Sequence, residues 1–357
     1  MTLAFYAPLK PSDHVVPSGD RAMARGLIAA LEHAGYKVEI ASTLRTRDGA
    51  GDPDVQARLI AQAKAAQPAI VAQGRAARWQ AWVTYHNYYK APDLLGPTVS
   101  EALGIPYVLI EATRARKRLT GAWADYAARA EAACDAADVI YYLTTRDAEA
   151  LQRDAPAAQK LIHLNPFLPR GDLPCASSLT GPMLSVGMMR AGDKLASYRL
   201  IAETLHAMSA EDWTLHIAGD GAVRPDVQAL MAPFEARVRF LGALNEADLE
   251  TAYRNAALLL WPGVNEAFGM IYLEAQGHGL PVIAQDRPGV RDVLAPGVYP
   301  SPEAGPAALA RRAQELLADP ECLHKASANA RDHVAQHHLL PHAAQTLRKG
   351  LTGLVRS

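Results

Sequence analysis

Cysteine is scarce in this chain of 357 residues. The three cysteines, Cys134, Cys175 and Cys322, are odd in number and lie far apart. Such a set excludes a disulfide framework and matches none of the cysteine patterns of zinc sites. We therefore expect reduced thiols and a cytoplasmic location.

The net charge is also small, and the apolar runs are short. The 36 basic and 37 acidic residues leave a formal charge of −1, which gives no reason to expect a nucleic-acid partner. No apolar run approaches the ~20 residues that span a bilayer. The opening MTLAFYAPLKPSDH has neither a basic stretch nor a long apolar stretch. We expect no secretion signal and no membrane-spanning helix.

The chain is too long for one ordinary core, and its pattern divides into two halves. Short apolar runs alternate with helical spacing, which is typical of parallel, doubly wound sheets. In the first half the expected strands are residues 3–8, 37–42, 69–73, 82–86, 107–112 and 139–144. Proline and glycine interrupt the pattern at 165–182, and the alternation then restarts. We predict domains at 1–170 and 171–340, and a C-terminal helix at 341–357 that packs back on the first domain.

One segment of the second half carries two glutamates in a mostly apolar helix. The strand of residues 257–262 runs into the turn GVNEAFG, and a helix is expected from about Phe268 to Gly277. Glu266 lies at the helix entrance, and Glu274 lies ~80° round and ~12 Å farther along the axis. Taken singly, each is explained as a cap-region acid or a solvated surface residue. Together they suit a long ligand with hydroxyls at both ends and a diphosphate on the helix N-terminus, which describes a nucleotide sugar.

The same segment resembles the signature of family 4 glycosyltransferases, which are retaining enzymes of the GT-B fold. Their motif joins an E-x7-E helix to a G-x-P-V strand and a glycine-containing turn with an acid. The matching residues are Glu266, Gly269, Glu274, Gly279, Pro281, Val282, Gly289 and Asp292. Pro288 and Asp292 stand where the family commonly has glycine and glutamate.

The resemblance implies roles for these residues. Glu266 would contact the hydroxyls of the donor sugar, and Glu274 would contact the ribose. A backbone stretch would hold the distal phosphate, namely Ala267, Phe268, Gly269 and Met270.

Two further segments fit the resemblance. In the family, a glycine after the first strand of this half is followed by an arginine and a lysine that grip the diphosphate. Gly187 and Lys194 match, whereas Met188 occupies the usual arginine position and Arg190 is the nearest arginine. We expect Arg190 and Lys194 to stabilise the charge of the leaving nucleoside diphosphate. The family's turn near the base is matched by Gly219 and Gly221.

The first half carries the weaker part of the resemblance. Ser18 and Gly19 stand where the family often has two glycines near the diphosphate, and Asp20 fits a helix cap. His86 ends a strand among three tyrosines. With Glu266, Lys194 and Arg190 it completes our set of catalytic candidates, and a structural histidine is the alternative.

Glu111 is the candidate on the acceptor side. It ends the strand of residues 107–112, where the family commonly has a histidine. It could bind an acceptor hydroxyl or pair with Arg114. Arg114 itself opens a basic cluster, which is typical of a solvated loop and allows at most a weak peripheral contact with the inner face of a membrane. The other members of this cluster are Arg116, Lys117 and Arg118.

No metal site is expected. The sequence DPD at 52–54 matches the D-x-D motif of another glycosyltransferase fold, but it precedes a helix, so we interpret it as a loop and a cap. The four histidines between 333 and 342 lack the H-E-x-x-H pattern and a carboxylate partner.

Together the residues and the resemblance predict an α/β protein of the GT-B fold. Two tandem Rossmann-like domains with parallel sheets would face a shared cleft, followed by C-terminal helices. The predicted activity is a retaining, metal-independent hexosyl transfer from a UDP-sugar or GDP-sugar to an unidentified saccharide or glycolipid, as in polysaccharide biosynthesis. No cofactor is expected, and the oligomeric state is left open. The alternatives are a nonhydrolysing nucleotide-sugar epimerase and a catalytically degenerate protein that binds a nucleotide sugar.

Overall fold

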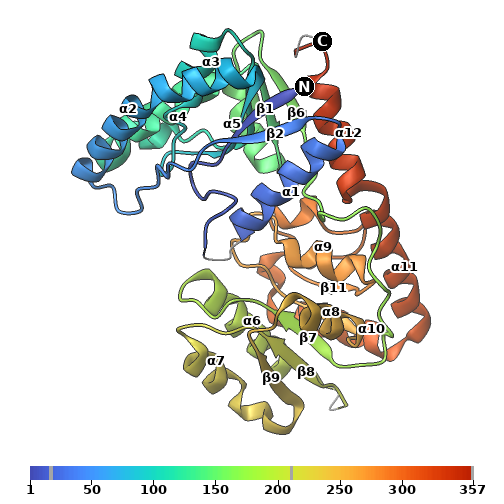
Figure 1. The fold of residues 1–357 in the computed structure, drawn as a ribbon. Helices are drawn as coiled ribbons and strands as arrows, with labels where there is room; N and C mark the ends of the chain where they lie inside the picture. The colour runs from blue at the N-terminus through green and yellow to red at the C-terminus, as the bar shows by residue number, and fades with distance from the viewer. Residues whose placement is uncertain (16–18, 210–211, 355–357) are drawn as a thin grey trace. The chain divides into compact units, whose positions relative to one another are not determined.

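The computed structural model describes residues 1–15, 19–209 and 212–354, and the chain forms two compact units. Unit 1 consists of Met1–Asn165 and Leu340–Ser357, and unit 2 consists of Pro166–Leu339. Each unit has one sheet of parallel strands with helices beside it (Figure 1). Ser18, one of the positions singled out in the sequence, lies outside the described residues.

Unit 1 has six parallel strands in the order β2-β1-β3-β4-β5-β6. The strands are β1 Thr2–Tyr6, β2 Lys37–Ser42, β3 Trp79–Asn87, β4 Tyr107–Ala112, β5 Val139–Tyr142 and β6 Lys160–His163. The helices are α1 Gly19–His33, α2 Pro53–Ala77, α3 Gly96–Leu103, α4 Ala124–Ala136, α5 Thr145–Asp154 and α12 Leu340–Leu351. The central strands β3 and β4 are almost entirely buried, as in parallel sheets covered on both faces.

The predicted strand at 69–73 is wrong, because these residues lie inside the long helix α2. The buried residues Gln56, Ala63 and Ile70 recur every seven positions, which places them on one stripe of a helix. The helix starts as predicted, since the Asp52 carboxylate caps it by accepting from the Asp54 and Val55 backbone N–H groups. The interpretation of DPD as a loop and a cap is therefore confirmed.

The last described helix belongs to unit 1. Helix α12 packs against α1, and the two lie side by side in Figure 1. The Tyr141 hydroxyl of β5 donates to the Leu347 carbonyl of α12 (2.8 Å). A Cβ on Gly350 would lie 2.1 Å from the same hydroxyl, so this contact requires glycine.

Unit 2 has five parallel strands in the order β11-β10-β7-β8-β9. The strands are β7 Met183–Val186, β8 Leu215–Ala218, β9 Val238–Gly242, β10 Leu258–Leu260 and β11 Val282–Ile283. The helices are α6 Asp193–Ala207, α7 Arg224–Met231, α8 Glu246–Arg254, α9 Met270–Gly277, α10 Gly305–Ala318 and α11 Pro320–His337. Strand β10 lies near the middle of the sheet and is fully buried.

The proline-rich segment at 165–182 packs on unit 2. Leu168 and Leu179 are buried within the core of that unit. The Leu168 backbone N–H donates to the His338 carbonyl (2.8 Å), and the Ser177 N–H donates to the His278 carbonyl (2.7 Å). This segment has no helical or strand period, yet its backbone is bonded to the body of unit 2.

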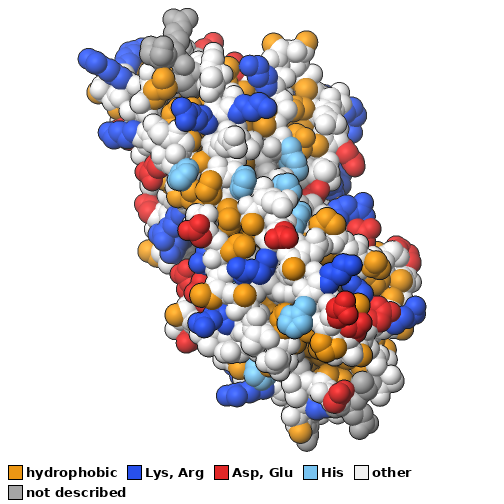
Figure 2. Space-filling view, turned by 90° about the vertical axis from the view of Figure 1, so that its right-hand side faces the viewer, with side chains coloured by type: hydrophobic (Ala, Val, Ile, Leu, Met, Phe, Trp, Pro, Cys, Tyr) orange, Lys and Arg blue, Asp and Glu red, His pale blue; other side chains and the backbone are white. Residues whose placement is uncertain are grey.

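Basic and acidic side chains are interspersed over the face shown in Figure 2, which agrees with the net charge near zero. Across the described ranges, no helix is both long and apolar enough to span a bilayer.

Candidate functional site

Three loops of unit 2 bring the predicted donor residues to one edge of its sheet. Strands β10, β7 and β8 are neighbours, and the loops begin where these strands end, at Trp261, Gly187 and Gly219. Ligands of open parallel sheets bind at this carboxyl edge.

Glu266 is held by two neighbouring side chains. Its Oε1 accepts a hydrogen bond from Trp261 Nε1 (3.0 Å) and forms an ion pair with Lys194 Nζ. The Lys194 ammonium also lies 5.1 Å from the centre of the Trp261 ring. The side chains of Glu266 and Lys194 are 14% and 31% exposed, so the pair is partly open to solvent. The structure thus joins two predicted catalytic residues and adds Trp261, which was not predicted.

The loop that carries Glu266 is anchored to the first turns of α6. Ser197 Oγ accepts from the Val264 backbone N–H (3.1 Å), and Asn265 Nδ2 donates to Asp193 Oδ2 (3.0 Å). Asn265 has a left-handed backbone (φ 53°), which asparagine tolerates better than most residues. These contacts fix the loop to α6 and, with it, the ion pair of Glu266.

Helix α9 begins at Met270, two residues later than the predicted start at Phe268. The reason is Gly269, whose φ of +74° is left-handed and therefore not helical. A Cβ at Gly269 would lie 2.7 Å from the Tyr272 ring, so glycine is required here. Ala267 lies in the loop before it and is exposed, while Phe268 and Met270 are half-buried.

Glu274 lies in α9 with its carboxylate turned toward α8. Oε2 accepts a hydrogen bond from the Tyr253 hydroxyl (2.8 Å), and the Tyr253 ring stacks on His278 at 5.3 Å. Burial raises the pKa of Glu274, and the Tyr253 hydrogen bond only partly opposes this. Glu274 is half-buried and bonded to Tyr253, so it is not a freely solvated surface glutamate. Tyr253 lies 21 residues before Glu274, and no pattern in the sequence linked the two.

The predicted donor glycines are required by the fold itself. A Cβ at Gly219 would lie 1.9 Å from the Gly187 carbonyl oxygen, and one at Gly221 would lie 2.3 Å from the Met189 carbonyl oxygen. A Cβ at Gly187 would lie 2.4 Å from the Trp261 ring. These glycines therefore let the loops after β7, β8 and β10 approach one another, which explains their presence without a ligand.

Arg190 is not part of the Glu266 cluster. Its side chain is exposed, and within the described part of the chain its contacts are made by its backbone, which bonds to Met188 and Leu195. Met188 is 48% exposed. The fixed cation of this site is Lys194.

A second cluster lies in unit 1, at the carboxyl ends of the adjacent strands β3 and β4. His86 and Glu111 both have left-handed backbones, with φ of 67° and 59°. His86 Nδ1 lies 3.8 Å from Glu111 Oε1 and 3.5 Å from Asp20 Oδ1. Such conformations cost of order 1–3 kcal/mol in non-glycine residues and cluster at functional sites.

The electrostatics of this cluster are coupled. Burial raises the pKa of Glu111, and His86 opposes this. Burial alone lowers the pKa of His86, but the carboxylates of Glu111, Asp20 and Asp147 outweigh it, so the pKa is raised. Glu111 Oε2 and His86 Nδ1 are buried and have no hydrogen-bond partner among the described residues.

Glu111 does not pair with Arg114, so that alternative is wrong. The guanidinium of Arg114 is 1% exposed and bonds to Glu131 (2.8 Å) and Asp135 (2.7 Å) instead.

Gly19 and Asp20 form the first turn of α1. Asp20 lies inside this turn rather than at the predicted cap and is the residue that reaches His86. A Cβ at Gly19 would meet nothing within 4 Å, so packing does not require glycine there.

Residues 1–15, 19–209 and 212–354 contain no group of three or more histidine, cysteine, aspartate or glutamate residues that could hold a metal ion. The histidines near the end of α11 contact one another, with His338 Nε2 3.0 Å from His333 Nε2.

Comparison with known sequences finds a family match within unit 2. Residues 195–333 match the family described as Glycosyl transferases group 1. The chain is 36% identical over 104 residues to D-inositol 3-phosphate glycosyltransferase from Streptomyces bingchenggensis, covering 27% of this chain and 22% of that protein. It is 37% identical over 95 residues to GDP-mannose-dependent alpha-mannosyltransferase from Mycolicibacterium smegmatis, covering 26% and 24%. The chain thus matches about a quarter of the length of these curated relatives.

Comparison with solved structures covers both units. Sucrose-phosphate synthase from Thermosynechococcus elongatus superposes with a TM-score of 0.73 at 18% identity, over 98% of this chain and 97% of that one. Anabaena HepE, solved in complex with UDP and glucose, gives 0.67 at 17% identity, over 98% and 99%. The lipopolysaccharide outer core galactosyltransferase WaaB gives 0.66 at 15% identity, over 98% and 99%. The fold is the GT-B fold, as predicted.

Proposed function

We propose that this chain, of which residues 195–333 match the family described as Glycosyl transferases group 1, transfers a hexose from a nucleoside-diphosphate sugar to an acceptor hydroxyl, with retention at the anomeric carbon and without a metal ion. The observation that carries this proposal is the pair of carboxylates on one loop and helix. Glu266 and Glu274 are both held by aromatic donors, one before α9 and one two turns along it.

The donor would lie along this loop and helix. Glu274 would accept hydrogen bonds from the ribose hydroxyls, and Glu266 from hydroxyls of the sugar. The backbone N–H groups of residues 267–270 would bind the distal phosphate, because they lie where the α9 dipole is positive. Gly187, Gly219 and Gly221 would line the diphosphate and the base.

Lys194 would stabilise the leaving group. Negative charge accumulates on the nucleoside diphosphate as the glycosidic bond breaks, and a fixed ammonium nearby lowers the energy of that state. In this structure Glu266 forms an ion pair with this ammonium. The diphosphate would therefore share or replace Glu266 as its partner, and exposed Arg190 would add a second cation. A phosphate oxygen of the leaving group would take the proton of the acceptor hydroxyl on the same face of the sugar.

Unit 1 would supply the acceptor side. Glu111 Oε2 and His86 Nδ1 are buried atoms that have no hydrogen-bond partner among the described residues. An acceptor hydroxyl could form a hydrogen bond with each of them. Their left-handed backbones hold these side chains at the ends of adjacent strands. The acceptor is then a hydroxyl-bearing saccharide or glycolipid. The three unpaired thiols fit the reducing cytoplasm, where nucleotide sugars are used.

A thermal-shift panel of uridine, guanosine and adenosine diphosphates and their sugars tests the donor site. A ligand at 100 times its dissociation constant adds about 2.7 kcal/mol, or about 5–10 °C for a domain of this size. We expect one nucleotide series to shift the wild type and the exposed-residue control Glu203→Ala, but not Glu274→Ala. Lys194→Ala should keep most of the shift and lose about 100-fold or more in turnover. Equal kinetics in the Glu274 and Lys194 variants would overturn the assignment.

Two observations favour the alternatives. The close His86–Glu111 pair suits acid–base chemistry, so a nonhydrolysing epimerase is tested by incubating the nucleotide sugar without acceptor and looking for an epimeric sugar. Met188 in the usual arginine position suits a degenerate binding protein. Tight nucleotide-sugar binding without turnover across many acceptors would support that reading.

A further inference from the structure

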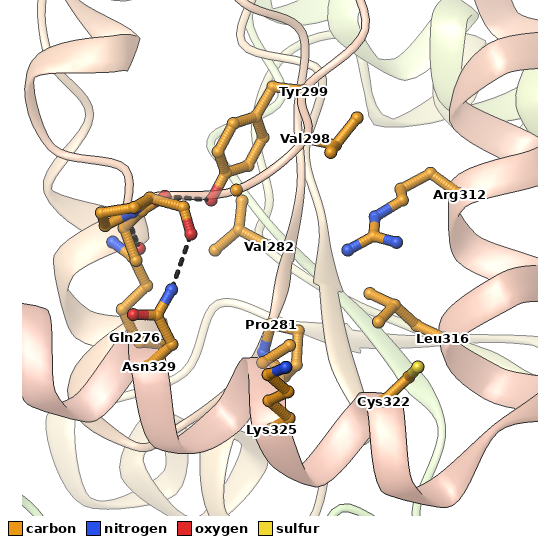
Figure 3. A pocket seen from close by; sticks show the side chains of 15 residues that line it. Gln276, Pro281, Val282, Val298, Tyr299, Arg312, Leu316, Cys322, Lys325 and Asn329 are labelled. Carbon is orange, nitrogen blue, oxygen red and sulfur yellow. Dashed lines mark hydrogen bonds between the residues drawn. The ribbon is translucent and has the colours of Figure 1, made fainter.

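A cavity of about 460 Å³ lies in unit 2, apart from the residues of the donor site. Its walls come from the end of α9, from β11, from the facing helices α10 and α11, and from the segment 295–299 (Figure 3). It includes Pro281 and Val282, at the start of β11, whereas the donor residues follow the carboxyl ends of other strands. Neither Glu266 nor Lys194 lines it.

The cavity has a fixed apolar wall. Val282, Leu316 and Val298 contribute aliphatic surface, and Val298 at the rim is 71% exposed. The segment 295–299 is held in place by two hydrogen bonds, from Asn329 Nδ2 to the Pro296 carbonyl (2.6 Å) and from the Tyr299 hydroxyl to the Ala295 carbonyl (2.9 Å). The Pro296 and Ala295 carbonyls of this wall are therefore bonded within the protein, which holds the segment against α11.

The charges that line the cavity have one sign. Arg312 of α10 and Lys325 of α11 are the charged residues among its fifteen lining residues, and Figure 3 shows the Arg312 guanidinium directed into the space. This guanidinium forms an ion pair with exposed Glu315, 3.3 Å away on the same helix and outside the lining. An exposed ion pair of this kind is weak, so it does not prevent Arg312 from binding another anion.

We propose that this cavity is a second ligand site, for a small organic anion that carries a phosphate or carboxylate on an apolar body. The anionic group pairs with Arg312 and Lys325, and the apolar body covers Val282, Val298 and Leu316. A planar guanidinium and an ammonium on facing helices suit a tetrahedral or planar oxyanion, and aliphatic walls orient the remainder of the molecule. The site does not depend on the proposed transfer reaction, because none of the residues to which that reaction gives a role lines the cavity.

Cys322 supplies a direct readout, since its exposed thiol lines the cavity. The labelling rate of Cys322 by N-ethylmaleimide is followed by peptide mass spectrometry at mildly alkaline pH, with and without 1-naphthyl phosphate. Exposed Cys175, which does not line the cavity, is the internal control in the same molecule. At ten times the dissociation constant the Cys322 rate should fall about tenfold and the Cys175 rate should not change.

Variants distinguish binding at Arg312 and Lys325 from a general effect of positive surface charge. Arg312→Gln and Lys325→Gln should each weaken protection, and the double variant should abolish it. Arg311→Gln removes the same charge from the neighbouring, exposed position of α10 and should leave protection intact. Neutral 1-naphthol should protect poorly.

A parallel experiment distinguishes a lipid phosphate from a small soluble phosphate as the ligand. Vesicles of phosphatidylcholine with phosphatidic acid, compared with phosphatidylcholine alone, test a lipid phosphate. Protection of Cys322 by acidic vesicles alone or by naphthyl phosphate alone supports the site and names the source. The proposal is overturned if neither protects at millimolar concentration, if naphthol protects equally, or if the double variant remains protected.

Discussion

The half-buried carboxylate of Glu274 should cost stability until a ligand binds. Burial raises the pKa of Glu274 above the ordinary 4.5, so the folded protein holds this proton more tightly than the unfolded chain does. The free energy of unfolding therefore falls as pH rises through the window that begins at about 4.5. At neutral pH the wild type carries this cost, because the hydrogen bond from Tyr253 compensates only part of the lost hydration.

Glutamine at this position keeps the shape and an acceptor for Tyr253 but removes the charge. We expect Glu274→Gln to raise the free energy of unfolding at pH 7.5 by about 0.5–2 kcal/mol, the range typical of a single stabilising substitution. This corresponds to roughly 1–8 °C in Tm for a domain of 150–250 residues. The gain should vanish below about pH 4.5, where the wild-type carboxyl is protonated in both states.

The assay is chemical denaturation of wild type and variant across this pH range, without and with the nucleotide that stabilises the wild type. In the presence of nucleotide the order should reverse, because loss of a charged hydrogen-bond acceptor costs about 1.5–3 kcal/mol, or about 10–100-fold in Kd. Glu203→Gln, on the exposed face of α6, is the matched charge control and should change neither quantity. A Glu274→Gln variant that is less stable than wild type at pH 7.5 would refute the reasoning.

Three further perturbations test the packing and charge arguments. Gly219→Ala should destabilise unit 2 by about 3 kcal/mol, because a Cβ would lie 1.9 Å from the Gly187 carbonyl oxygen at a φ of +147°; an unchanged denaturation midpoint would contradict this. Arg114→Met should cost about 3–5 kcal/mol by leaving Glu131 without its cation, and a loss below 1 kcal/mol by the same measurement would count against it. His86→Asn should flatten the stability profile above pH 6.5, since the raised pKa of His86 makes its contribution present below 6.5 and lost as pH rises; a profile that keeps its slope would place the titrating group elsewhere.

Most strands of the first sheet, and β10 of the second, were predictable from apolar runs bounded by turn residues. The residues 107–112 were predicted as a strand with the bounds that β4 has. The strand predicted at 69–73 was wrong because a short apolar run has no period that distinguishes a strand from a helix. The evidence for a helix lay farther away, in the capping residue Asp52 and in the buried residues that recur every seven positions along α2. The exposed edge strand β6 was missed because its partly polar residues give no apolar run.

The candidate site was predictable in its residues more than in its contacts. The spacing of Glu266 and Glu274 pointed to both carboxylates, but it did not show that Trp261 and Tyr253 hold them, because those contacts depend on tertiary packing. The turn glycines were assigned to ligand binding, and the structure adds that the close approach of neighbouring loops also requires Gly187, Gly219 and Gly221. The roles proposed for these residues stay predictions for the experiments above.

Unit 1 is assembled from the two ends of the chain, and this has a consequence for biosynthesis. Its last helix, α12, is translated after the whole of unit 2, yet it covers α1 and binds Tyr141 of the first sheet. Domains usually fold as they leave the ribosome, N-terminal first. Here unit 1 emerges first but is completed only when α12 has been synthesised, whereas all residues of unit 2 are available earlier. A premature stop codon near residue 340 would therefore disrupt unit 1, although the missing residues follow unit 2 in the sequence.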